Sequence, residues 1–160
     1  MAHRGLTGVL LAGGESRRFG SPKGEAVYDG ETLAARAWRL LGEACDERLL
    51  VGPGGLPDPG TGPVAAIAAG LRAATHDVCV VVPVDMPLLT VAALHVLADA
   101  CRDAAVAQHG PLPCAVRRDA FPATDERRLR AVLAGLDTAQ VELDENVLVN
   151  VNTPEELTSL

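Results

Sequence analysis

The sequence predicts an α/β fold built on an open, mainly parallel sheet. Short apolar runs without polar alternation, typical of strands buried on both faces, alternate with longer segments of helical periodicity. Residues 8–12 and 78–84 are the clearest of these runs. A chain of 160 residues, 48% of them hydrophobic, has the length and apolar content of a single domain spanning residues 1–160.

The first half of the chain contains three strand–helix units in succession. In chain order, the expected strands and helices are 8–12, 32–44, 48–51, 64–74, 78–84 and 90–102. The helical segments carry apolar residues three and four positions apart, as at Leu33, Ala37 and Leu41. Residues 52–63 are mostly Gly, Pro and Asp, which predicts a loop.

The second half has weaker signals until its last helix. Residues 112–116 and 147–151 are expected to be strands, and 125–133 a helix. A final helix is well marked, because Thr153 can cap it, Pro154 suits its first position and Glu156 completes a capping box.

Charge and composition exclude several classes of partner. The net charge is −7 and only four residues are aromatic, so we expect neither a nucleic-acid surface nor an anionic-membrane surface. The four cysteines, which have no CxxC or metal-ligand spacing, are Cys45, Cys79, Cys101 and Cys114. Reduced thiols and the absence of a secretory signal pattern at the N-terminus predict a cytoplasmic protein, which we expect to be monomeric.

Three residues at the carboxyl ends of expected strands point to one crevice. Ligands of open α/β sheets bind beyond these ends, where Gly13, Gly52 and Asp85 lie. A carboxylate at the end of a buried strand favours Mg²⁺, whose remaining ligands a triphosphate could supply. The alternative for Asp85 is a turn or helix-capping role before Met86-Pro87.

The segment after the first strand has the properties of a phosphate loop. Gly13 and Gly14 allow backbone N–H groups to approach a phosphate, and Arg17 adds positive charge. Lys23 is the only lysine, against thirteen arginines, and an ammonium acts on phosphate as a compact charge. The alternative is one solvated lysine in an Arg-biased composition.

Two amides occur near the C-terminus. Asn150 and Asn152 flank one residue of the expected strand 147–151, so their side chains should point the same way and suit a shared ligand. The alternative for Asn152 is a role in starting the last helix.

Four motifs together resemble the nucleotidyltransferases with a glycosyltransferase-A-like fold. They are the loop from Leu11 to Lys23, the segments Gly62–Ile67 and Pro83–Leu89, and Asn150–Leu157. The last motif is closely similar to that of the molybdenum cofactor guanylyltransferases (MobA-like). This resemblance covers nearly the whole chain and implies a three-layer, Rossmann-like α/β fold with a mostly parallel sheet.

The resemblance implies an Mg²⁺-dependent transfer of GMP from GTP to molybdopterin, or to the molybdenum cofactor, with release of pyrophosphate. Molybdoenzyme maturation proteins are then possible partners. The expected nucleotide-binding residues are Leu11, Ala12, Gly13, Gly14, Lys23, Gly52, Asp58 and Asp85, where Asp58 rests on the resemblance alone. The expected catalytic residues are Asp85, which would also bind the metal, Lys23 and Arg17. Asn150 and Asn152 would bind the acceptor substrate.

Three departures from the family pattern leave alternatives open. Pro22 stands where the family usually has Asp before the loop lysine, and Gly52 stands where it often has Asn. The chain also has little material between Asp103 and Asp144, the region that the resemblance implies should help hold the pterin. The alternatives are a cytidylyltransferase, a guanylyltransferase acting on another small phosphorylated acceptor, and a catalytically inactive nucleotide-binding regulator.

Overall fold

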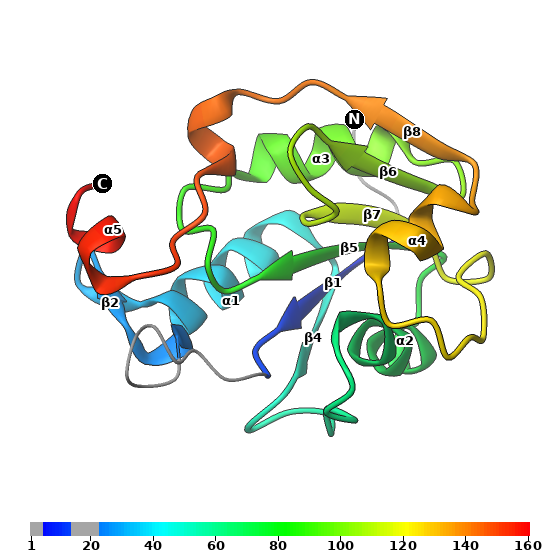
Figure 1. Cartoon of the computed structure of the whole chain (residues 1–160), viewed down its shortest axis with the longest axis horizontal. Coiled ribbons are helices and arrows are strands. Elements are labelled where there is room, and N and C mark those ends of the chain that lie inside the picture. Colours follow the sequence, from blue (N-terminus) through cyan, green and yellow to red (C-terminus); the bar gives the residue numbers. More distant parts are fainter. Residues whose placement is uncertain (1–4, 14–22) are drawn as a thin grey trace.

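The computed structural model of this chain describes residues 5–13 and 23–160, which form a six-stranded sheet with helices on both faces (Figure 1). The strands of this sheet are β1 (Leu6–Leu11), β4 (Glu47–Val51), β5 (Val78–Pro83), β6 (Ala104–Ala107), β7 (Cys114–Arg117) and β8 (Thr138–Val141). The helices are α1 (Leu33–Ala44), α2 (Pro63–Ala73), α3 (Val91–Ala100), α4 (Leu129–Ala134) and α5 (Pro154–Thr158). Smaller elements are the 3₁₀ helices η2 (Lys23–Glu25) and η3 (Glu145–Leu148) and the paired strands β2 (Val27–Tyr28) and β3 (Glu31–Thr32).

The sheet is mostly parallel, as expected. Its strand order is β4-β1-β5-β7-β6-β8, and β7 runs antiparallel to both of its neighbours. The pairs β1–β4, β1–β5 and β6–β8 are parallel. Five of the six strands therefore end at the same edge of the sheet, and this edge carries the functional site.

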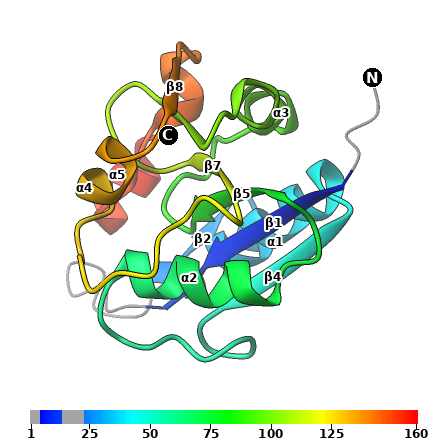
Figure 2. The same ribbon diagram turned by 90° about the vertical axis from the view of Figure 1, so that its right-hand side faces the viewer.

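Alternate residues along each strand enter two separate core layers. Val9 and Val81 pack against α2 and α4, whereas Leu10 and Val80 pack against α1 and α3. Figure 2 shows the two helical layers on opposite sides of the sheet. These buried side chains fix the strand register, because a shift by one residue would move each of them to the other layer.

The helix starts follow the capping signals in the sequence. The hydroxyl of Thr32 accepts from the N–H of Ala35 at 3.1 Å to cap α1. The Thr153 cap predicted for α5 is confirmed, since its hydroxyl accepts from the N–H of Glu156. The Glu156 carboxylate reaches back as in a capping box, but accepts from the N–H of Asn152, one residue before the cap. None of the helices in the described part of the chain is long and apolar enough to span a membrane.

Two strands of the second half were missed, and two elements are displaced. The residues of β6 are Ala, Ala, Val and Ala, a composition with low intrinsic strand preference. The edge strand β8 contains Thr138 and Gln140 and lacks an apolar run. The strand expected at 112–116 begins only after Pro113, which has no N–H to donate. The helix expected at 125–133 begins at Leu129, since the Glu126 carboxylate binds the N–H of Arg128 just before it.

The strand predicted at 147–151 is wrong. Residues Glu145–Leu148 form η3, which starts where the Asp144 carboxylate accepts from the N–H of Asn146. The chain then passes beside the end of β5, where the N–H of Val151 donates to the carbonyl of Asp85 at 2.8 Å. This single backbone contact replaces the expected ladder.

Candidate active site

A cavity of about 710 Å³ opens at the carboxyl edge of the sheet. Its walls contain the ends of β1, β4 and β5, the loop after β4 and the start of α2. They include every predicted nucleotide-binding residue in the described part of the chain, namely Leu11, Ala12, Gly13, Lys23, Gly52, Asp58 and Asp85. Gly14 and Arg17 lie outside the described residues. The crevice predicted from the strand ends is therefore a real cavity of ligand size.

The backbones at the ends of β1 and β4 are in direct contact at the cavity wall. The N–H of Ala12 donates to the carbonyl of Val51 at 2.9 Å, and Gly52 adopts φ +133°. A Cβ atom added to Gly52 would lie 2.7 Å from the backbone nitrogen of Gly13. Only glycine allows this approach without displacing the neighbouring main chain.

The Asp58 side chain lies directly against Gly13 in this turn. A Cβ added to Gly13 would lie 2.0 Å from Oδ2 of Asp58. The other carboxylate oxygen of Asp58 accepts from the N–H of Gly60 at 2.8 Å, which fixes the side chain in place. Asp58 therefore stands directly beside the exposed main chain of Gly13, where a ligand could contact both.

A cation and a carboxylate meet in the centre of the cavity. Nζ of Lys23 lies 3.3 Å from Oδ2 of Asp85 and 3.5 Å from Oδ1 of Asn152, and the Lys23 and Asp85 side chains are 16% and 20% exposed. Oδ1 of Asp85 is buried and accepts no hydrogen bond from the described residues. A buried carboxylate oxygen without a donor is suited to a bound cation.

The donor set fits a magnesium ion that also binds phosphate. The described residues contain no cluster of three or more His, Cys, Asp or Glu side chains. Asp85 would therefore contribute one carboxylate, and phosphate oxygens and water would complete the coordination.

The two predicted acceptor-binding amides are placed differently. Asn152 joins Lys23 and Asp85, because the bond from Val151 to the Asp85 carbonyl holds the preceding residue beside β5. Neither amide is among the residues that line the cavity, and Asn150 is exposed without a hydrogen bond to Lys23 or Asp85 in the described part of the chain. Their shared orientation was inferred from a strand that does not form.

The sequence reading missed the start of α2 as part of the site. Gly62 and Pro63 line the cavity, and no side chain caps this helix terminus. The free N–H groups and the dipole of an 11-residue helix both favour a negatively charged ligand. The Gly-Pro pair before an apolar run was the available signal.

The cysteines do not take part in the site. Cys79 and Cys114 are buried, all four thiols are free, and none lines the cavity. Burial raises the pKa of Cys45 and of Cys79 to about 12, so these thiols stay protonated near neutral pH.

Comparisons with known proteins agree with this geometry. The family model of the MobA-like NTP transferase domain matches residues 8–145. A molybdenum cofactor guanylyltransferase from Burkholderia vietnamiensis is 34% identical over 97% of this chain and 95% of that protein. One from Xanthomonas euvesicatoria is 34% identical over 98% of this chain and 95% of that protein.

Two solved structures have the same fold. A nucleotidyl transferase from Methanothermobacter superposes with a TM-score of 0.83 at 19% identity, covering 98% of this chain and 96% of that one. The molybdopterin-guanine dinucleotide biosynthesis protein A of Archaeoglobus fulgidus gives a TM-score of 0.73 at 21% identity, covering 96% and 95%. The expected nucleotidyltransferase fold is thereby confirmed.

Proposed function

Because this chain belongs to the MobA-like NTP transferase family, we propose that it transfers GMP from GTP to molybdopterin or its molybdenum-loaded form. The observation that carries the proposal is the meeting of Lys23, Asp85 and two glycine turns in one cavity of about 710 Å³. Two relatives, each 34% identical to this chain, are named molybdenum cofactor guanylyltransferase and are matched over 95% of their own length.

Binding of the nucleotide would rely on main-chain groups rather than aromatic stacking. No aromatic residue lines the cavity in the described part of the chain, whereas Gly13 is exposed there. The N–H groups of Ala12 and Gly52 already donate to backbone carbonyls, which leaves the Gly13 N–H as the main-chain donor beside them. A backbone N–H directed at O6 of guanine would face an amine in ATP and remain without an acceptor. An unsatisfied buried donor costs roughly 1–3 kcal/mol, which is about tenfold to over a hundredfold in affinity.

The transfer itself requires positioning and charge neutralisation. A phosphate oxygen of the acceptor forms a bond to the α-phosphorus of GTP, the bond from this phosphorus to the oxygen bridging to the β-phosphate breaks, and pyrophosphate leaves. Lys23 would stabilise the phosphate charge from one side, and the N-terminus of α2 from the other. Asp85 would hold Mg²⁺ through its free Oδ1, and the bound ion supplies further neutralisation of the phosphate oxygens.

Pyrophosphate release with GTP, Mg²⁺ and molybdopterin tests this proposal. We expect turnover by the wild type and preference for GTP over ATP, CTP and UTP in titration calorimetry. Asp85→Asn should lose turnover and the Mn²⁺ binding measured by electron paramagnetic resonance, while its circular dichroism spectrum stays unchanged.

The same assay separates the alternatives. Faster turnover with CTP than with GTP would identify a cytidylyltransferase. Turnover with a sugar phosphate but not with molybdopterin would identify a guanylyltransferase that acts on another phosphorylated acceptor. GTP binding without any turnover would support an inactive regulator. Wild-type turnover by Asp85→Asn would remove Asp85 from the mechanism.

A further inference from the structure

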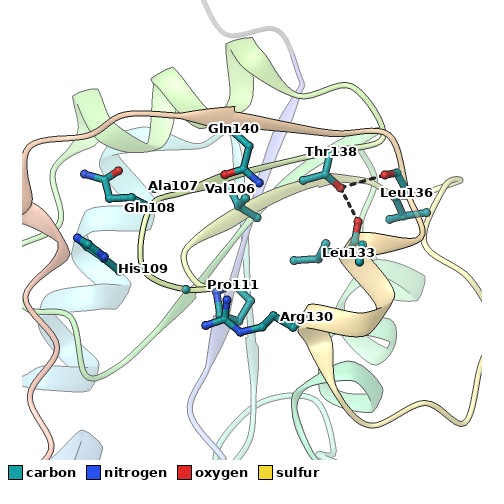
Figure 3. Close-up of a pocket in the computed structure, with 12 residues that line it drawn as sticks. Val106, Ala107, Gln108, His109, Pro111, Arg130, Leu133, Leu136, Thr138 and Gln140 are labelled. Carbon is teal, nitrogen blue, oxygen red and sulfur yellow. Dashed lines mark hydrogen bonds between the residues drawn. The ribbon is translucent and has the colours of Figure 1, made fainter.

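A second cavity, of about 430 Å³, lies beside the nucleotide cavity and has no role in the functions considered so far. Its walls come from the ends of β6 and β8, the turn at residues 108–111 and helix α4 (Figure 3). The two cavities share one stretch of chain, because Pro111 lines the second cavity and Leu112 lines the first. A ligand in the second cavity could therefore reach into the nucleotide site.

Aliphatic side chains form one part of the lining of this second cavity, which is polar elsewhere. Val106 and Leu133 are buried core residues, and Leu136 packs against the same core. A floor of aliphatic side chains between a strand and a helix suits the face of a flat ring system, because it removes apolar ring surface from water.

One wall of the second cavity is held rigidly by polar side chains. The side-chain amide of Gln108 donates to the carbonyl of Leu143 and accepts from its N–H at 3.0 Å. Nε2 of His109 lies 2.6 Å from the Glu145 carboxylate. These contacts tie the turn to Leu143 and to Glu145 at the start of η3, so the polar groups of Gln108 and His109 are already engaged.

Two other polar side chains in the same cavity are not engaged. Within the described part of the chain, neither Arg130 nor Gln140 makes a side-chain hydrogen bond or ion pair. Figure 3 shows the Arg130 side chain extending from α4 toward Pro111, and Gln140 descending from β8 beside Val106. Both residues are exposed, so their polar groups are hydrated and available to a ligand. A guanidinium beside a nucleotide cavity, in a protein of net charge −7, is suited to a second anion.

We propose that this second cavity binds the acceptor, with its planar heterocycle on the Val106 floor and its phosphate on Arg130; the assignment of a pterin rests on the proposed function. The Gln140 side chain presents an NH₂ donor group beside a carbonyl acceptor, an arrangement that matches the amide-like edge of a pterin ring. The Arg130 side chain extends toward Pro111, whose neighbour Leu112 lines the nucleotide cavity, so a phosphate bound by Arg130 would lie on that side. The guanidinium can bind this phosphate through two parallel N–H groups.

Binding of neopterin and neopterin monophosphate, followed by pterin fluorescence anisotropy, tests the two contacts separately. Arg130→Gln should weaken neopterin monophosphate about tenfold or more and leave unphosphorylated neopterin unchanged, since only the phosphate contact is lost. Gln140→Leu should weaken both pterins several-fold. Both variants should bind GTP as the wild type does.

Arg72→Gln is the matched control, because it removes one arginine charge from an exposed helical position outside both cavities. It should bind both pterins like the wild type. If Arg72→Gln and Arg130→Gln lose neopterin monophosphate binding equally, the loss is an effect of net charge and the assignment of Arg130 is overturned.

Two further outcomes would overturn the inference. One is unchanged binding of neopterin monophosphate by Arg130→Gln. The other is tighter, Arg130-dependent binding of glucose 1-phosphate, which would exclude the pterin. Failure of the proposed function is visible separately, as an absence of wild-type turnover with GTP and molybdopterin. If turnover occurs and Arg130→Gln keeps the wild-type KM for molybdopterin, the acceptor cavity is wrong and the proposed function stands.

Discussion

The contact between the ends of β1 and β4 predicts that Gly52→Ala damages both stability and nucleotide binding. Gly52 has φ +133°, a conformation that residues with a side chain rarely adopt. A Cβ here would also meet the nitrogen of Gly13 at 2.7 Å and the carbonyl carbon of Ala12 at 2.9 Å. Both are main-chain atoms, so no change of rotamer can relieve the contact.

A second variant separates the two causes of the expected loss of stability, which are backbone strain and steric overlap with the neighbouring main chain. Gly54, in the same turn, has φ +85° and nothing within 4 Å of its Cβ position. Gly54→Ala should therefore carry only backbone strain, roughly 1–2 kcal/mol. Gly52→Ala should carry similar strain and roughly a further 1–3 kcal/mol from overpacking. Displacement of the Gly13 N–H should also weaken GTP binding about tenfold, if one hydrogen bond to the nucleotide is lost.

Urea unfolding and GTP titration calorimetry of the two variants measure these effects side by side. Gly54→Ala should bind GTP like the wild type, whereas Gly52→Ala should be less stable than Gly54→Ala and bind GTP more weakly. Equal unfolding free energies and equal GTP affinities for the two variants would refute the reasoning, because the close approach to Gly13 would then have no consequence.

The remaining predictions concern a lysine, a carboxylate and the thiols. Lys23→Arg should raise the KM for nucleotide or lower kcat, because a planar guanidinium cannot occupy the position of an ammonium between Asp85 and Asn152. Unchanged kinetics would remove Lys23 from phosphate binding. Glu47 accepts from Thr75, through its N–H and its hydroxyl, and from the Thr7 hydroxyl, and these bonds lower its pKa. Its ionised form therefore stabilises the fold above the ordinary pKa of 4.5, and this contribution is lost as pH falls through the lowered value. Glu47→Gln should accordingly destabilise the protein by roughly 1–2 kcal/mol in urea unfolding at pH 7 and by less in acid. A thiol reagent such as Ellman's should react slowly with the native protein, whereas all four thiols should react after unfolding. Rapid reaction of the native protein would contradict the burial that raises the cysteine pKa values.

Much of the first half of the fold could be predicted, because its elements carry unambiguous local signals. The strands β1 and β5 are apolar runs buried on both faces. The helix α1 has its apolar residues on one face and a Thr cap at Thr32. Each local preference agrees with the tertiary environment of its segment, which is the condition under which sequence patterns are reliable.

The second half could not be predicted in the same way, because tertiary packing decides its structure. Residues 104–107 are a strand since they lie between β7 and β8, although three of the four are alanine. The apolar run 147–151 has strand character, but no neighbouring strand is available to pair with it. A strand needs a partner, and the sequence of a short segment does not identify one.

The nucleotide cavity was predictable to the extent that sheet topology alone determines it. Gly13, Gly52 and Asp85 meet because parallel strands end at one edge, whatever loops follow them. Asp58 lies in a loop without regular structure, and only the family resemblance indicated it. The acceptor cavity depends on β6, β8 and α4, the elements that sequence patterns missed or displaced. The resemblance implied only that the region between Asp103 and Asp144 helps hold the pterin, and nothing in the sequence singled out Arg130 or Gln140.

Asn152 shows how a correct residue can follow from an incorrect structural premise. The two amides were expected to share an orientation through strand alternation, yet the segment is not a strand. Asn152 reaches Lys23 for another reason, since the N–H of Val151 binds the carbonyl of Asp85 and the N–H of Asn152 binds the Glu156 carboxylate of the capping box. These bonds fix residue 152 between the end of β5 and the start of α5. Asn150 has no such bonds and stays exposed, so the start of the last helix, rather than a two-residue period, selects the amide that joins the site.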